Sequence, residues 1–212
     1  MVSVAVAASE AVAAALAAAA VATLAAAARP AVGKPMNMHK LKRLLKHLWL
    51  DASDAQRAVP PDMLARLAKR VAASEQRHTG QLRVCVEAAL PMSYLWRLGR
   101  SDSMAQLVRQ RALMLFGKLR IWDTEHNNGV LVYLQLAEHA IEIVADRGLS
   151  QHVTPEQWQA MVERMRSNFQ QRRFEDGLTQ ALEEVSALLV AYFPATAGGQ
   201  RVDELPNVPL VQ

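Results

Sequence analysis

Apolar residues follow strand-like patterns in three segments of the chain. Residues 129–137, GVLVYLQLA, are apolar on both faces, which predicts a strand in the centre of a sheet. Residues 139–145, HAIEIVA, alternate instead, with Ile141 and Ile143 on one side, which predicts a strand with one more exposed face. Residues 82–90, LRVCVEAAL, complete the set of predicted strands.

Segments with helical periodicity, in which apolar residues recur three and four positions apart, lie before, between and after these strands. Thr154-Pro155-Glu156-Gln157 is typical of a helix start, because it combines proline at the first position with the spacing of a capping box. The methionines and aromatic residues of these segments fall on the apolar stripes, which indicates core positions. The predicted helices cover residues 60–77 and 104–119, a segment from Thr154 to Phe169, and one from Leu178 to Tyr192.

The order of elements is therefore helix, strand, helix, strand, strand, helix, helix. A strand–helix–strand unit normally joins parallel strands by a right-handed crossover. The second and third strands are too close in sequence for anything but an antiparallel hairpin. The pattern predicts an α/β fold, a three-layer α/β/α sandwich whose small mixed sheet carries helices on both faces.

Residues 1–35 form a separate, alanine-rich leader without a charge between residues 11 and 28. Three interpretations stay open: translated upstream sequence ahead of a start at Met36 or Met38, a cleaved signal, or a weak membrane anchor. A signal is disfavoured because Glu10 lies where a basic region should be. We expect a cytoplasmic location, with membrane association, export or a weak N-terminal anchor as the alternatives.

Residues 36–58 are expected to form a basic amphipathic helix and a linker. In KLKRLLKHLWL, residues 40–50, the leucines and Trp49 share one helical face and the cations take the other. Such a helix suits an anionic membrane surface or a protein partner. The interpretation that we favour is that its leucines pack on the domain.

Charge is concentrated in that same region. Residues 34–50 carry five cations and no acid, whereas residues 51–212 sum to −1 within a chain of net charge +4. The predicted domain, residues 59–193, thus lacks the basic face that nucleic-acid binding needs, so we expect no nucleic-acid partner. The lone Cys85 lies in an apolar run, which excludes a disulfide framework and a cysteine zinc site and fits a reducing compartment.

The C-terminal tail, residues 194–212, contains Pro194, Gly198, Gly199 and Pro206, and is expected to be an irregular arm. Its VPLV segment leaves open an alternative in which the tail lies against a sheet edge or a partner.

Polar residues gather at the outer ends of the predicted hairpin. Because the hairpin returns its last residues to the start of its first strand, Asp123, Asn127, Asn128 and Asp146 should converge at one sheet edge, near the helix that starts at Thr154. Carboxylate and amide oxygens are hard ligands suited to Ca²⁺ or Mg²⁺. The same residues are also ordinary turn formers, and that alternative stays open.

Several motifs together resemble one known family. GQLRVCVEAAL, NNGVLVYLQLAEHAIEIVADRGL, a tryptophan in the next helix and FEDGL are similar to the TPM domain family, the thylakoid-lumen phosphatase-like proteins and their bacterial relatives. The resemblance covers residues 60–193. It implies an α/β/α sandwich, acid phosphatase activity in some members and calcium binding in an acidic groove near the NGVL strand.

Carried onto this chain, the resemblance places Asn128 and Gly129 in the motif, with Asp123 and Asp146 as the nearest acids. Many members have an acid where Asn128 stands, so we expect weaker metal binding here. The resulting expectation is a TPM-domain protein with a Ca²⁺ or Mg²⁺ site and phosphatase-like hydrolysis through metal-held water, without an evident nucleophile or organic cofactor. The alternative is a non-enzymatic interaction module near the membrane.

Overall fold

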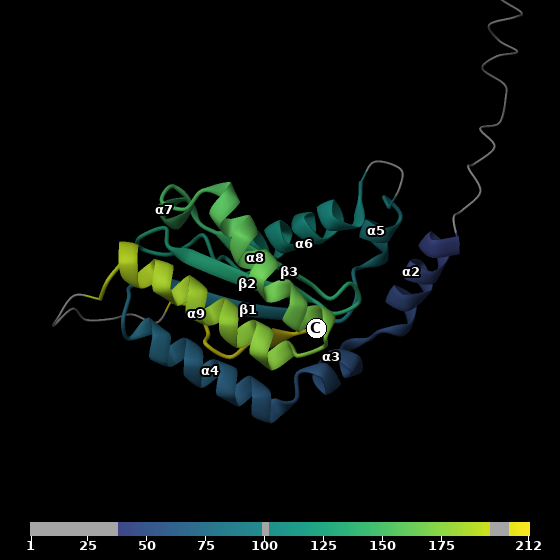
Figure 1. Ribbon diagram of the computed structural model, residues 1–212, viewed down its shortest axis with the longest axis horizontal. Helices are drawn as coiled ribbons and strands as arrows, with labels where there is room; N and C mark the ends of the chain where they lie inside the picture. The colour runs from purple at the N-terminus through teal and green to yellow at the C-terminus, as the bar shows by residue number, and fades with distance from the viewer. Residues whose placement is uncertain (1–37, 99–101, 196–203) are drawn as a thin grey trace, which may run out of the picture. The chain divides into compact units, whose positions relative to one another are not determined.

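The structure, a computed structural model, describes residues 38–98, 102–195 and 204–212 (Figure 1). The chain divides into two units, residues 1–41 and 42–212. The account below concerns the second unit and helix α2, which begins four residues before it. The expectations for residues 1–35 fall outside the described residues.

Helices and strands alternate largely as the hydrophobic pattern predicts. The strands are β1 (Gln81–Glu87), β2 (Gly129–Gln135), β3 (Ala140–Ala145) and β4 (Leu210–Val211). The longer helices are α2 (Met38–Trp49), α4 (Pro61–Glu75), α6 (Met104–Lys118), α8 (Pro155–Gln170) and α9 (Phe174–Tyr192). Three shorter helices, which the pattern did not predict, are α3 (Ala52–Ala58), α5 (Met92–Leu95) and α7 (Arg147–Ser150).

The sheet has the strand order β3-β2-β1-β4. Strands β1 and β2 are parallel, with Gln81 opposite Gly129, which confirms the predicted crossover. Strands β2 and β3 form the predicted antiparallel hairpin, with Val130 opposite Ala145. Every residue of β2 is buried, as expected for a central strand that is apolar on both faces.

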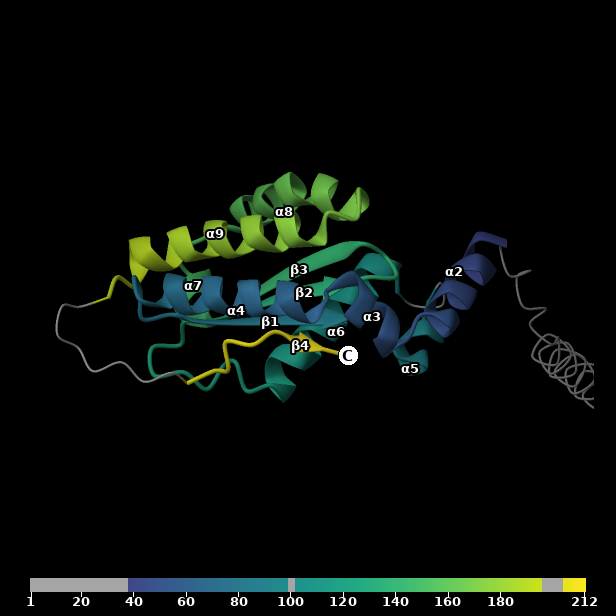
Figure 2. The same cartoon turned by 90° about the horizontal axis from the view of Figure 1, so that it is seen from below.

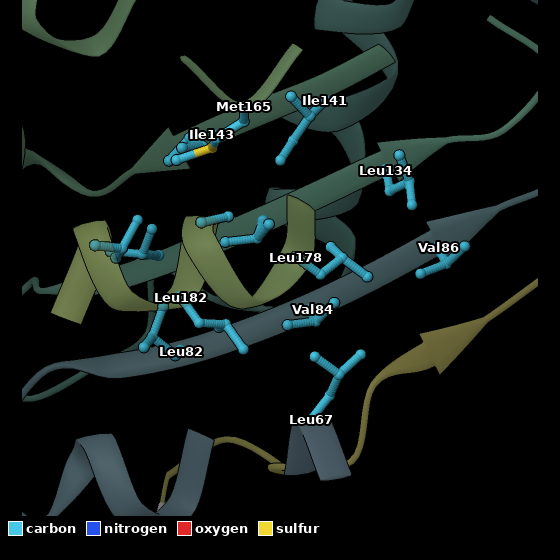
Figure 3. Close-up of a cluster of buried hydrophobic side chains, with 14 of the residues drawn as sticks. Leu67, Leu82, Val84, Val86, Leu134, Ile141, Ile143, Met165, Leu178 and Leu182 are labelled. Atoms are coloured by element: carbon cyan, nitrogen blue, oxygen red, sulfur yellow. The ribbon is translucent and has the colours of Figure 1, made fainter. Parts of the chain in front are cut away.

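One face of the sheet packs against α4, α8 and α9 (Figures 1 and 2). Alternate side chains of the strands point into this layer, because successive residues of a strand face opposite sides. Figure 3 shows Leu82 and Val84 of β1 facing Leu178 and Leu182 of α9, with Leu67 of α4 below them. This cluster contains most of the buried aliphatic side chains and forms the main core.

The other face packs against α6. The side chains that alternate with the first set, Cys85, Leu131 and Tyr133, pack here with Leu107 and Leu115 of α6. Helices therefore cover both faces of a mixed sheet, and the predicted α/β/α sandwich is confirmed. None of the helices in the described ranges is long and apolar enough to cross a membrane.

The end of the C-terminal tail is ordered against the sheet, which differs from the expected irregular arm. Leu210 and Val211 pair in parallel with Cys85 and Val86 of β1, so the tail forms the edge strand β4. The guanidinium of Arg83 donates to the carbonyl of Val208 at 2.6 Å and also to that of Pro206. The alternative that placed VPLV on a sheet edge is therefore the correct one.

Helix α2 forms where the sequence predicts it, but the expectation that its leucines pack on the domain holds for Leu44 and is wrong for Leu45 and Leu48. Leu44 packs against the α6-side core, and His47 is buried. His47 is buried because both ring nitrogens find partners: Nδ1 accepts from the amide of Leu90 at 3.1 Å, and Nε2 lies 3.3 Å from Glu138. The exposed fractions are 37% for Leu41, 44% for Leu45, 58% for Leu48 and 83% for Trp49.

Candidate functional site

The loops before β2 and after β3 meet at one edge of the sheet. The amide of Asp146 donates to the carbonyl of Gly129 at 2.9 Å, and the amide of Gly148 donates to that of Asn127 at 2.9 Å. A Cβ atom on Gly148 would lie 2.5 Å from the Asn127 carbonyl, so this approach requires glycine. Asn127 itself adopts a left-handed backbone with φ of 52°, which asparagine tolerates better than most residues.

Asp146 is the buried acid of this edge, with 9% of its surface exposed. It caps α7, and its Oδ1 accepts from the amide of Arg147 at 2.7 Å. Its second oxygen, Oδ2, is buried and has no hydrogen-bond partner in the described part of the chain. A buried carboxylate oxygen without a partner is costly, because nothing replaces the water that it loses.

Two amide side chains lie in the loop that Asp146 meets. The Oδ1 of Asn127 accepts from Nε of Arg147 at 3.2 Å. Asn128 is buried; its amide donates to the hydroxyl of Thr124 at 3.1 Å, and its Nδ2 lies 3.3 Å from the hydroxyl of Thr79. Both asparagines therefore lie where the two loops meet: Gly148 binds the carbonyl of Asn127, and Asp146 binds the carbonyl of the residue after Asn128.

Asp123 makes its contacts elsewhere. Its Oδ2 accepts from the guanidinium of Arg120 at 2.5 Å, its amide donates to the Arg120 carbonyl at 3.0 Å, and its side chain is 48% exposed. Within the described ranges, no hydrogen bond or ion pair connects Asp123 to Asn127, Asn128 or Asp146. The structure thus links three of the four residues in one loop cluster and leaves the fourth as a solvent-facing partner of an arginine.

Gln81, opposite Gly129 at the start of β1, also lies at this edge of the sheet. Its Oε1 accepts from the amides of Glu204 and Leu205, each at 3.3 Å, so it holds the tail in place. The expectation that α8 begins here is modified. The helix that begins in the cluster is the short α7 rather than α8. Helix α8 does begin with the predicted capping box, in which Thr154 and Gln157 bind each other's amides.

A cleft of about 500 Å³ lies beside β3, with Trp158 of α8 in its wall. Its lining includes Ala145, the residue before Asp146, and Ser150, the last residue of α7. Arg109 and Arg166 also line it, and each forms an ion pair with a glutamate at 3.3 and 3.0 Å. Asp146 itself is not among the lining residues, and the two arginines of the cleft are already partly neutralised.

The four site residues named from the sequence leave out two groups. Arg147, which donates to Asn127, adds a cation to the loop cluster; its place directly after Asp146 was the available signal.

At the other end of β1, buried Glu87 accepts from Nε of Arg111 at 2.9 Å and from the hydroxyl of Tyr133 at 2.6 Å. Burial raises the pKa of Tyr133 well above its usual range, and the Glu87 charge adds to that shift. This second group joins α6 to the sheet.

The candidate ligands include few acids. Within residues 38–98, 102–195 and 204–212, no three histidine, cysteine, aspartate or glutamate side chains gather closely enough to hold a metal ion. The loop cluster instead combines one buried carboxylate with amide side chains and main-chain carbonyls. A cation there would have oxygen ligands of low total charge, which fits weak binding of a hard ion.

A fold of this kind, with polar loops at the NGVL end of the hairpin, matches a known family. The profile of the TPM domain matches residues 53–188. The chain belongs to the TPM domain family. Among solved structures, the NMR structure of the BA42 protein from the psychrophilic bacterium Bizionia argentinensis is similar, with a TM-score of 0.59 and 24% sequence identity. The match covers 72% of this TPM-domain chain and 94% of BA42, and shows a shared fold. No curated protein matches the chain significantly.

Proposed function

We propose that this TPM domain binds a divalent cation, Ca²⁺ or Mg²⁺, at the loop cluster of Asp146, Asn127 and Asn128. The observation that supports the proposal is the buried Oδ2 of Asp146, which has no partner in the described part of the chain. A hard cation would satisfy this oxygen, since carboxylates, amide oxygens and water are its usual ligands. With one carboxylate in the set, we expect a dissociation constant of about 1 mM.

We further propose that the domain hydrolyses phosphomonoesters weakly. When bound, the cation would polarise the phosphate and lower the pKa of a water molecule. Arg147 is exposed beside Asn127, where its guanidinium can bind a phosphate oxygen. The cleft beside Ala145 and Ser150 has room for the leaving alcohol. Asp146 would hold its ligand without rearrangement, because the α7 cap and the β2–β3 hairpin fix its position.

Thermal melting with and without cation tests the binding step. With 10 mM CaCl₂ or MgCl₂ at constant ionic strength, the melting temperature of the wild type should rise by about 3 °C, as expected when the cation concentration is about tenfold above the dissociation constant. Asp146→Asn should abolish the rise. In EDTA the same variant should be at least as stable as the wild type, because it replaces an unpaired buried charge.

Asp123→Asn is the matched comparison, because it removes one negative charge from the same loop but from a side chain that pairs with Arg120. It should keep the cation-induced rise. No rise in the wild type, or an equal rise in Asp146→Asn, would overturn the proposed site.

Hydrolysis of p-nitrophenyl phosphate tests the second step separately. We expect slow, cation-dependent release of p-nitrophenol that falls at least tenfold in Asp146→Asn and several-fold in Arg147→Gln. A cation-induced rise in melting temperature without any hydrolysis would retain the binding site and reject the enzymatic half of the proposal.

A further inference from the structure

Helix α2 turns an apolar face away from the rest of the unit to which residues 42–49 belong. Leu45, Leu48 and Trp49 are spaced by three and four positions, so they lie side by side on the helix surface. All three are exposed, up to 83% for Trp49. A large tryptophan exposed next to two leucines forms a patch rather than isolated surface residues, and such patches mark interaction sites.

The helix cannot simply rotate to bury this face. His47 lies on the opposite side of the helix and is fixed by the amide of Leu90 and the carboxylate of Glu138. Arg43 reaches the same carboxylate, with Nε 3.4 Å from Oε2. Burying the leucines would break these contacts and expose Glu138 and Leu90. The fold therefore holds the apolar face outward.

Cations border the patch. Lys42 is three positions before Leu45, and Lys46 is three positions before Trp49, so both lysines flank the apolar stripe. Both are exposed, and neither forms an ion pair within the described ranges. Helix α2 contains no acidic residue. The charge that α2 itself carries beside the apolar stripe is thus entirely positive, whereas residues 51–212 are close to neutral.

We propose that the α2 outer face, defined as Leu45, Leu48 and Trp49 with the flanking Lys42 and Lys46, docks on an anionic lipid bilayer. Apolar side chains beside lysines match the two layers of a membrane surface, acyl chains below and negative headgroups above. Tryptophan suits the boundary between these layers, because its ring is apolar and its N–H is polar. The inference does not depend on the cation site.

Flotation of the full chain with vesicles tests this surface. In 50 mM salt, the chain should float with phosphatidylcholine vesicles that contain 30% phosphatidylserine and stay behind with pure phosphatidylcholine. Lys42→Glu/Lys46→Glu should weaken binding by about 30-fold or more, since each basic residue near an anionic surface contributes roughly fivefold and the substitutions also reverse the charge. Lys69→Glu/Lys118→Glu, which changes the same net charge elsewhere, should weaken it far less.

Trp49→Ala should weaken vesicle binding by about tenfold and abolish a blue shift of tryptophan emission on adding anionic vesicles. Trp122→Ala is the matched control, because Trp122 is also exposed, at 48%, and it should preserve both signals. Circular dichroism verifies that each variant is folded, as expected for substitutions of exposed side chains.

Three results would overturn the proposal. The first is equal binding of the wild type to neutral and anionic vesicles. The second is vesicle binding that is unchanged in both the lysine double variant and Trp49→Ala, which would place the membrane contact elsewhere in the chain. The third is absence of flotation together with a dimer that Leu48→Ser dissociates, because a second copy would then cover the patch.

Discussion

The amide of Asp146 lies 2.9 Å from the carbonyl oxygen of Gly129, although seventeen positions separate the two residues in the sequence. This hydrogen bond extends the β2–β3 ladder by one pair beyond Val130 and Ala145. It fixes the residue that follows β3 beside the residue that begins β2. The carboxylate of Asp146 is therefore positioned by the main chain of the hairpin, and its location does not depend on a ligand.

The contact between Gly148 and Asn127 should be intolerant of any side chain. In Gly148→Ala, the added Cβ would lie 2.5 Å from a main-chain oxygen, so the two loops must separate. We expect the free energy of unfolding to fall by about 1–3 kcal/mol, as for other overpacked sites, and the cation-induced rise in melting temperature to disappear. Urea denaturation measures the first effect.

Gly117→Ala is the control for that variant, because an added Cβ at Gly117 would meet nothing within 4 Å. This glycine lies in the last turn of α6, where alanine should raise the free energy of unfolding by about 0.5 kcal/mol. Equal effects of the two substitutions would contradict the proposed close approach.

Substitutions within the Glu87–Arg111–Tyr133 group should have strongly non-additive effects on the free energy of unfolding. Arg111→Met leaves the Glu87 carboxylate buried without its cation and should lower the free energy of unfolding by about 3 kcal/mol. The triple variant Glu87→Leu/Arg111→Met/Tyr133→Phe removes every polar member at once and should recover most of that loss. Additive losses in a mutant cycle measured by urea denaturation would show that the three groups act independently.

The main features of the fold could be predicted from spacing, because the strands and long helices each carry a periodic apolar pattern. The double-sided apolar run of GVLVYLQ indicated a central strand, and the two-residue periodicity of HAIEIVA indicated its antiparallel neighbour. Helix α2 shows the limit of this argument. Its leucines have the correct spacing for a buried face, but a histidine with two polar partners, Leu90 and Glu138, decides which side packs.

The candidate site was predictable in location but not in detail. Hairpin topology alone brings the loop of Asp146 to the loop of Asn127, and in the structure main-chain hydrogen bonds join the two loops. The pairing of Asp123 with Arg120 depends on a left-handed turn at Arg120, with φ of 56°, that no hydrophobic pattern encodes. The engagement of Gln81 by the tail likewise results from a contact across more than 120 positions.

Cys85 should be chemically inert in the folded protein. Burial, together with the nearby negative charge of Glu87, raises the pKa of its thiol to about 12. Because the thiolate is the reactive form, modification by Ellman's reagent at pH 8 should be slower than for a free thiol by several orders of magnitude, and should become fast in 8 M urea. Rapid stoichiometric modification of the native protein would mean that β1 opens locally near β4.

The contact of α2 with Glu138 should weaken in acid. Burial favours the neutral acid, but the hydrogen bond from His47 and the charges of Arg43, His47 and Lys46 outweigh it and lower the pKa of Glu138. A carboxyl group whose pKa is lower in the folded state stabilises the fold fully above its unfolded pKa of about 4.3, and this contribution is lost as the pH falls through the lower, folded value.

Hydrogen exchange of the Leu90 amide, which donates to His47, reports this contact directly. Its protection factor, normalised to that of Val132 in the central strand, should decrease below about pH 4 in the wild type. Glu138→Gln should show lower normalised protection already at pH 7, because the charge that holds His47 is absent, and should respond less to acid. If both proteins lost protection at the same pH and to the same extent, another group, rather than Glu138, would control the docking of α2.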